Sequence, residues 1–267
     1  MRDTDSIPTI ILCGGRGLRI RESSSTLPKP LLPIGNRPLV WHVMKLYAAH
    51  GHADFVLALG YLAETIKEFF LHFEARTNDF RIELGAPERV EYLNPLPEAG
   101  WRVSCVDTGL STPTGTRVRR AADFTQGQTV MVTYGDGVGD VDISALVAFH
   151  RAHGKLATIT AVRPRSRFGE LTVEDDGTVT CFDEKPPRRA GTVNGGFMVL
   201  EREAIERFIP LDREVALEGE PLSRLAEARQ LVAYRHDGFW QQVDTPNEQQ
   251  ALTDLWDTGD APWKVWE

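Results

Sequence analysis

Residues 9–19 read TIILCGGRGLR. The first four form a short apolar run that is typical of a buried strand, and this run leads directly into a glycine-rich turn. A junction of this kind is how α/β folds present backbone N–H groups to phosphate. Glycine permits the close approach, and Arg19 adds a planar, permanently charged group suited to phosphate oxygens. The spacing matches neither the P-loop nor the dinucleotide fingerprint, so an ordinary tight turn remains the alternative.

Apolar runs alternate with amphipathic segments through about the first 160 residues. This alternation indicates crossover units, and it predicts a Rossmann-like, doubly wound α/β fold with a mostly parallel, mixed sheet. Beyond residue 160, short strands and turns such as Asp176-Gly177 predict a decorated C-terminal half. The predicted strands are 9–12, 55–59, 102–107, 129–133, 156–162 and 231–235. The predicted helices are 38–50 with Asn36 as a possible cap, 62–73, one capped by Asp142 and closed by Gly154, 202–208, 220–229 and 246–256. The stretch 84–100 is expected to be irregular.

The composition argues against several classes of function. The chain has 267 residues, with 30 basic and 38 acidic side chains and a formal charge of −8, and no Lys/Arg block is present. We therefore expect no nucleic-acid partner. No apolar run approaches the roughly 18 residues of a membrane span, and the polar N-terminus does not resemble a signal peptide. Cys13, Cys105 and Cys181 show neither metal-ligand spacing nor a disulfide framework. We expect three buried thiols and a cytoplasmic protein.

Three further residues could meet a metal–triphosphate. Lys29 lies between two prolines that keep the backbone extended, although a surface-loop lysine is the simpler interpretation of that segment. Asp136 follows a predicted strand and has glycine on both sides, which places it at the ligand crevice of a parallel sheet. Asp244 follows a late aromatic run. Two carboxylates on one Mg²⁺ are a common way to bind metal–triphosphate. The alternatives are a turn-forming Asp-Gly for Asp136 and a helix N-cap for Asp244.

Two short motifs in the C-terminal half could bind a sugar phosphate. Glu184 could accept hydrogen bonds from sugar hydroxyls while Lys185 meets the phosphate, and the glycines after Asn194 leave room for a ligand. A salt-bridged turn and a β-bulge are the corresponding structural alternatives.

Taken together and in their order along the chain, the motifs resemble those of the sugar-1-phosphate nucleotidylyltransferases. The motifs are Leu-x-Gly-Gly-x-Gly-x-Arg, Lys-Pro, Gly-Asp-Gly, Glu-Lys-Pro, Asn-Gly-Gly and a late Asp. The segment 238–241 (GFWQ) and the tail 261–267 (APWKVWE) bring the resemblance closest to the branch that uses CTP and glucose 1-phosphate. The resemblance covers nearly the whole chain and is weakest over about 75–100.

The resemblance implies one domain, 1–267. About 1–160 would be the nucleotide-binding core, and about 161–267 the sugar-phosphate-binding and oligomerisation part. It implies Mg²⁺ as cofactor, CTP and a hexose 1-phosphate as substrates, and a homo-oligomer in which Thr112 and Arg117 reach the nucleotide across a subunit boundary. Catalytic residues would be Arg19, Lys29, Asp136, Lys185 and Asp244, with Asp136 and Asp244 holding the metal. Nucleotide-binding residues would be Leu12, Cys13, Gly14, Gly15, Gly17, Arg19, Lys29, Thr112, Arg117 and Gly135. Sugar-phosphate-binding residues would be Glu184, Lys185, Asn194 and Gly195.

Two positions depart from the family pattern. Leu18 stands where the family usually has threonine, and Leu27 where it often has a second lysine. Losing the hydroxyl removes one hydrogen bond to phosphate, typically about 1.5–3 kcal/mol when the partner is charged. A nucleotidylyltransferase with another base or sugar, and a catalytically weak ligand-sensing homologue, therefore stay open as alternatives.

Overall fold

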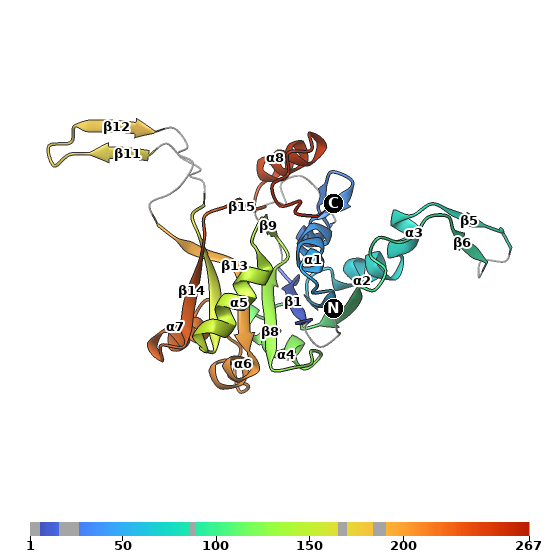
Figure 1. Ribbon diagram of the computed structural model, residues 1–267, viewed down its shortest axis with the longest axis horizontal. Helices are drawn as coiled ribbons and strands as arrows, with labels where there is room; N and C mark the ends of the chain where they lie inside the picture. The colour runs from blue at the N-terminus through green and yellow to red at the C-terminus, as the bar shows by residue number, and fades with distance from the viewer. Residues whose placement is uncertain (1–5, 16–26, 86–88, 165–169, 184–190, 267) are drawn as a thin grey trace.

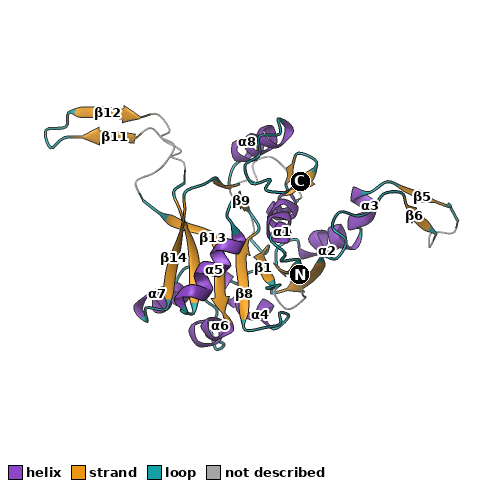
Figure 2. Ribbon diagram, in the orientation of Figure 1, coloured by secondary structure: helices purple, strands orange, loops and turns teal. Residues whose placement is uncertain are grey.

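A computed structural model describes residues 6–15, 27–85, 89–164, 170–183 and 191–266 of the chain. Within that part, seven strands form one central sheet (Figures 1 and 2). In spatial order they are β14 (Leu231–His236), β10 (Ala157–Val162), β13 (Val193–Glu201), β8 (Thr129–Tyr134), β1 (Thr9–Leu12), β4 (Asp54–Leu59) and β7 (Arg102–Asp107). Strand β13 runs antiparallel to both neighbours, and every other neighbouring pair is parallel. The predicted mostly parallel, mixed α/β sheet is confirmed.

Helices cover both faces of this sheet because its inner strands are apolar on both sides. Along β1, Ile11 belongs to one buried cluster, while Ile10 and Leu12 belong to the other. The first cluster is covered by α1 (Leu39–Ala49), α2 (Ala63–Leu71) and α5 (Ile143–His153). The second is covered by α4 (Thr114–Ala122), α6 (Arg202–Phe208) and α7 (Glu220–Glu227).

Two hairpins extend away from the sheet in different directions (Figure 1). One is β5 (Phe80–Ile82) with β6 (Val90–Tyr92), reached through the short helix α3 (Phe73–Thr77). The other is β11 (Glu170–Val173) with β12 (Val179–Asp183). The expectation of irregular structure over 84–100 is therefore wrong for β6. Its alternating apolar and charged residues pair with those of β5, which alternate in the same way.

The C-terminal tail folds back onto α1. Helix α8 (Pro246–Asp257) leads into the tail, in which Trp263 is fully buried and stacks on Phe239 with ring centroids 5.5 Å apart. The Trp263 indole N–H donates to Nδ1 of His42 at 3.3 Å. Burial lowers the pKa of His42 to about 4, so this ring is neutral near pH 7 and can accept that bond. The tail thus fixes the segment that begins at Phe239.

Several local predictions need correction. Asn36 does not cap α1; it lies in the tight turn between β2 (Pro33–Ile34) and β3 (Arg37–Pro38), which the positive φ of Gly35 (58°) permits. Asp142 does cap α5, accepting from the backbone N–H of Ala145 at 2.9 Å. No helix in the described ranges is long and apolar enough to cross a membrane.

The prediction of three buried thiols is correct only for Cys13. Cys105 is half-buried on the edge strand β7, and Cys181 is exposed on β12. An apolar sequence context did not predict burial at these two positions because edge and hairpin strands leave one side uncovered.

Candidate functional site

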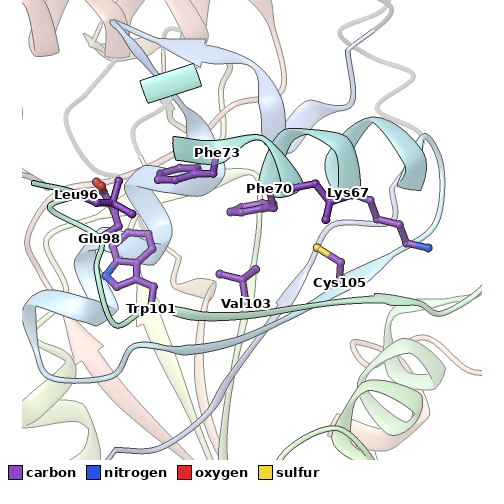
Figure 3. Close-up of a pocket in the computed structure, with 9 residues that line it drawn as sticks. Lys67, Phe70, Phe73, Leu96, Glu98, Trp101, Val103 and Cys105 are labelled. Atoms are coloured by element: carbon purple, nitrogen blue, oxygen red, sulfur yellow. The ribbon is translucent and has the colours of Figure 1, made fainter. Parts of the chain in front are cut away.

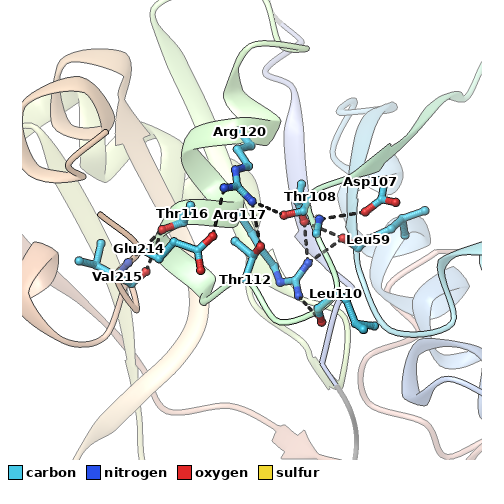
Figure 4. Close-up of polar contacts among 11 residues, drawn as sticks. Leu59, Asp107, Thr108, Leu110, Thr112, Thr116, Arg117, Arg120, Glu214 and Val215 are labelled. Atoms are coloured by element: carbon cyan, nitrogen blue, oxygen red, sulfur yellow. Dashed lines mark hydrogen bonds and ion pairs between the residues drawn. The ribbon is translucent and has the colours of Figure 1, made fainter. Parts of the chain in front are cut away.

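The loops that follow β1, β4 and β8 meet at the carboxyl edge of the sheet, and Arg117 binds the loop after β1 and the end of β4. Figure 4 shows its contacts with Leu59, Thr108 and Leu110. This buried side chain donates to the carbonyl oxygens of Leu59 (2.7 Å) and Gly14 (3.2 Å) and to the Thr108 hydroxyl (2.6 Å). A Cβ on Gly14 would lie 2.3 Å from the guanidinium. The glycine loop therefore needs Gly14 to accommodate Arg117, a reason that the sequence pattern alone did not show.

Lys29 connects the two predicted metal ligands. Its Nζ lies 2.8 Å from Oδ2 of Asp136 and 2.8 Å from Oδ1 of Asp244. The lysine side chain is only 12% exposed, so the surface-loop interpretation is wrong. Residues separated by 107 and 215 positions in the chain thus form one charged cluster.

Short backbone pairings bring the two acids together. Strand β9 (Gly137–Gly139) pairs antiparallel with β15 (Trp240–Gln242), and the N–H of Val243 donates to the carbonyl of Asp136 at 2.8 Å. The N-cap of α8 is Thr245, in a capping box with Glu248, rather than Asp244. The side chain of Asp244 is therefore directed to Lys29 instead of the helix.

A pocket of about 600 Å³ opens beside this cluster and contains most of the described residues predicted to bind nucleotide. Thr112 and Arg117 line this pocket together with the glycine loop of their own chain. A single chain is therefore sufficient to place them beside that loop. Gly135 does not line the pocket but packs behind it, where a Cβ would come within 3.0 Å of Cys13 Sγ. The predicted residues that line the pocket are Leu12, Cys13, Gly14, Gly15, Lys29, Thr112, Arg117 and Asp136.

A second pocket, of about 310 Å³, shares one wall with the first. Tyr134 and Asp136 line both pockets, and the second also contains Asn194 and Gly195 from β13, two of the residues predicted to bind the sugar phosphate. Because β13 runs antiparallel to β8, the amino end of β13 lies at the same sheet edge as Asp136. The arrangement therefore offers two adjoining compartments with a charged cluster between them.

Sequence reasoning missed seven residues of the smaller pocket, and four of them make side-chain hydrogen bonds at the site: Tyr134, Glu218, Trp240 and Gln242. The Tyr134 hydroxyl donates to Glu218, the Trp240 N–H donates to the carbonyl of Gly195 at 2.8 Å, and Gln242 donates to Asp136 at 3.2 Å. Burial, and then the Glu218 carboxylate, raises the pKa of Tyr134, so its hydroxyl stays protonated. A usable signal was present for Trp240, which belongs to the segment 238–241, and for Tyr134 and Gln242, which directly adjoin the Gly-Asp-Gly motif and that segment; Glu218 has none.

Four of the predicted site residues lie outside the described residues: Gly17, Arg19, Glu184 and Lys185, together with the unusual Leu18. Leu27, the other departure, is described and is 42% exposed.

A third cavity, of about 470 Å³, lies between helix α2 and the edge strand β7 (Figure 3). Its walls are mainly apolar and aromatic, including Phe70, Phe73 and Trp101, and Lys67 is the one basic residue among those that line it. Phosphate binding needs several converging donors; the larger of the two adjoining pockets is lined by two basic side chains, Lys29 and Arg117, whereas this cavity has one.

Comparisons with known proteins point in one direction. A profile described as "Nucleotidyl transferase" matches residues 8–254. The chain is 42% identical to the glucose-1-phosphate cytidylyltransferase of Salmonella typhi, covering 97% of this chain and 99% of the relative. It is 39% identical to a probable glucose-1-phosphate cytidylyltransferase of Bacillus subtilis, covering 96% and 99%. Among solved structures, HddC from Yersinia pseudotuberculosis complexed with GMP-PN is similar in fold, with a TM-score of 0.65 at 19% identity over 94% of this chain and 99% of that one.

Proposed function

The chain belongs to the nucleotidyl transferase family, and we propose that it transfers a cytidylyl group from CTP to α-D-glucose 1-phosphate, giving CDP-glucose and pyrophosphate. The observation that carries this proposal is the charged cluster of Lys29, Asp136 and Asp244, which stands where the two pockets adjoin. The choice of base and sugar rests on the full-length similarity to the cytidylyltransferases.

The reaction needs positioning and charge neutralisation more than acid–base chemistry. An oxygen of the sugar phosphate attacks the α-phosphorus in line and forms a new P–O bond. The bond between the α-phosphorus and its bridging oxygen breaks, and pyrophosphate leaves with the electron pair. The nucleophile is already an anion, so no general base is required. We assign the larger pocket to CTP, with Lys29 neutralising the triphosphate and Arg117 fixing the pocket wall through the carbonyls of Gly14 and Leu59.

Asp136 and Asp244 are suited to hold Mg²⁺. Both carboxylates lie 2.8 Å from the same ammonium nitrogen, so a single cation can reach both. Mg²⁺ is commonly bound by one or two carboxylates together with substrate phosphates. Bound there, it would neutralise charge on the phosphates. Arg19, Lys185, Glu184 and Asn194 are proposed for the phosphates and the sugar by their match to the family motifs.

Pyrophosphate release tests this function directly. The protein is incubated with Mg²⁺ and each pairing of CTP, UTP, GTP, ATP and dTTP with glucose, mannose and galactose 1-phosphates. We expect steady release with CTP and glucose 1-phosphate, and much less with the other pairs. Preference for another pair would reassign the base or the sugar. Nucleotide binding without release from any pair would instead support the ligand-sensing alternative.

We also propose that the protein is a homo-oligomer, because both hairpins leave apolar faces uncovered. In the β5–β6 hairpin, Phe80 faces Tyr92 and Ile82 faces Val90, and each of the four side chains is at least 36% exposed. A two-stranded hairpin alone is marginally stable in water, so a packing partner for this face is expected. A second copy supplies such a partner.

Replacing Phe80 and Tyr92 together by Ser should lower the solution mass, as measured by light scattering on a sizing column. A matched control is Arg81→Ser with Glu91→Ser. Arg81 and Glu91 are the cross-strand pair next to Phe80 and Tyr92. They form a 3.0 Å ion pair on the opposite face of the hairpin, and the control variant removes it. A monomeric wild type, or an unchanged mass in the Phe80/Tyr92 variant, would contradict the role of this hairpin.

We place the protein in the cytoplasm, where nucleoside triphosphates and reduced thiols are found, since all three cysteines are free. We further propose a single domain whose first 160 residues or so serve the nucleotide and whose remainder serves the sugar phosphate.

A further inference from the structure

Glu218 makes contacts on both sides of the boundary between the two pockets. One carboxylate oxygen accepts from the hydroxyl of Thr114 at 2.6 Å, and the other accepts from the hydroxyl of Tyr134. Thr114 lines the larger pocket, Glu218 lines the smaller one, and Tyr134 lines both. The side chains of these three residues therefore form a hydrogen-bonded chain from the nucleotide side to the sugar side.

The segment that carries Glu218 is firmly attached to the start of helix α4 (Figure 4). The N–H of Val215 donates to the Thr116 hydroxyl at 2.9 Å, and the N–H of Thr116 donates back to the Val215 carbonyl at 3.1 Å. The N–H of Leu217 donates to the Thr114 hydroxyl at 2.9 Å. A Cβ on Gly115 would lie 2.8 Å from the Val215 carbonyl, so the two segments are in close contact. Any displacement of the start of α4 is thus transmitted to Glu218.

Tyr134 is held on its other side by β13. Gly196 has a φ of 84°, and a Cβ there would lie 2.3 Å from the tyrosine ring. The ring consequently has little freedom, and its hydroxyl fixes one oxygen of Glu218. Each carboxylate oxygen has a further lone pair that can accept a bond from a ligand hydroxyl. Glu218 is exposed to solvent, so a ligand in the smaller pocket can reach it.

We propose that Glu218 is a positioning residue that couples the nucleotide pocket to the sugar pocket. Thr114 and Tyr134 orient its carboxylate, and the carboxylate in turn orients a hydroxyl of the sugar 1-phosphate. This inference rests on the proposed function, because it assigns the smaller pocket to the sugar. Its consequence is that a change on the nucleotide side, at Thr114, alters the affinity for the sugar.

Steady-state kinetics of the intact protein test this coupling. Thr114→Val removes the hydroxyl that holds Glu218, and we expect the KM for glucose 1-phosphate to rise roughly tenfold, the effect typical of one hydrogen bond to a charged group. The KM for CTP should change much less. Thr114→Ser retains the hydroxyl and should restore the sugar KM. A merely structural role for Thr114 would raise both KM values and lower kcat together.

A double-mutant cycle keeps the test decisive if Thr114→Val disturbs the loop. In a Glu218→Gln background, removing the Thr114 hydroxyl should add little to the sugar KM, whereas additive effects would overturn the coupling. The matched control is Glu220→Gln, which removes a carboxylate two residues away that pairs with Arg213 at 2.7 Å outside both pockets. It should leave both KM values unchanged. A wild type inactive with every substrate pair would refute the proposed function. An active wild type whose Thr114→Val variant keeps its sugar KM would refute only the coupling.

Discussion

Replacing Asp136 or Asp244 by Asn is expected to lower Mg²⁺-dependent turnover by at least about 100-fold. A bound divalent ion contributes several kcal/mol of charge stabilisation to such a reaction, and each 1.36 kcal/mol is a factor of ten in rate. The fold should survive, because the Asn amide oxygen can still accept a hydrogen bond from Lys29, and Lys29 keeps its remaining carboxylate at 2.8 Å.

Initial rates of pyrophosphate release across a range of Mg²⁺ concentrations check this expectation, with thermal melting as the test of folding. Asp212→Asn is a suitable control, since Asp212 is exposed and lines neither pocket. Unchanged turnover in either the Asp136 or the Asp244 variant would refute the assignment of that residue to the metal.

Lys29→Met should produce the second large effect, a fall in kcat/KM of about 100- to 1,000-fold, as is typical when one donor to a developing anionic charge is lost. The same substitution should strengthen binding of Mg²⁺ alone. On the proposed assignment, the ammonium group and the metal would compete for the same two carboxylates in the wild type, and the variant would lack that competitor. At the separations involved, charge interactions amount to a few kcal/mol, so the gain in Mg²⁺ affinity should be at least about tenfold.

Calorimetric titration with MgCl₂, without nucleotide, measures that affinity in both proteins. Lys155→Met is the control, because Lys155 is exposed and precedes β10, at the sheet edge opposite the one that carries Asp136. Equal Mg²⁺ affinity in the wild type and the Lys29 variant would show that the lysine and the metal do not compete. The opposite directions of the two effects also separate a specific role from unfolding, which would abolish both activity and Mg²⁺ binding.

Local patterns in the sequence were sufficient to predict the strands and helix caps that depend on neighbouring residues alone. The apolar run Thr9–Leu12 is a strand because it is buried on both faces of a parallel sheet. Asp142 caps its helix by accepting a hydrogen bond from the backbone N–H of Ala145, three residues further along the chain. The placement of Asp136 at the carboxyl edge followed from the alternation of strands and helices.

Long-range relations were beyond that kind of reasoning. The contact of Lys29 with both acids depends on the pairing of β9 with β15, two strands of three residues each. Arg117 was expected at the nucleotide, but four of its hydrogen bonds go to protein atoms, and that arrangement depends on how α4 packs. Glu218 has no motif around it, because its role comes from two hydroxyls 104 and 84 positions away.

The reversed strand β13 has a consequence for how such proteins diversify. The chain leaves the sheet at Val162 and returns at Val193, and these two residues are direct partners in the antiparallel ladder. The residues between them, among them the β11–β12 hairpin, form an inserted loop whose two ends are joined by the ladder, so its length and composition can change at little entropic cost to the core. That loop begins and ends at the substrate edge, and it contains Glu184 and Lys185. On the proposed roles of Glu184 and Lys185, we expect that exchanging this inserted loop between relatives changes the sugar preference and leaves the nucleotide pocket unchanged.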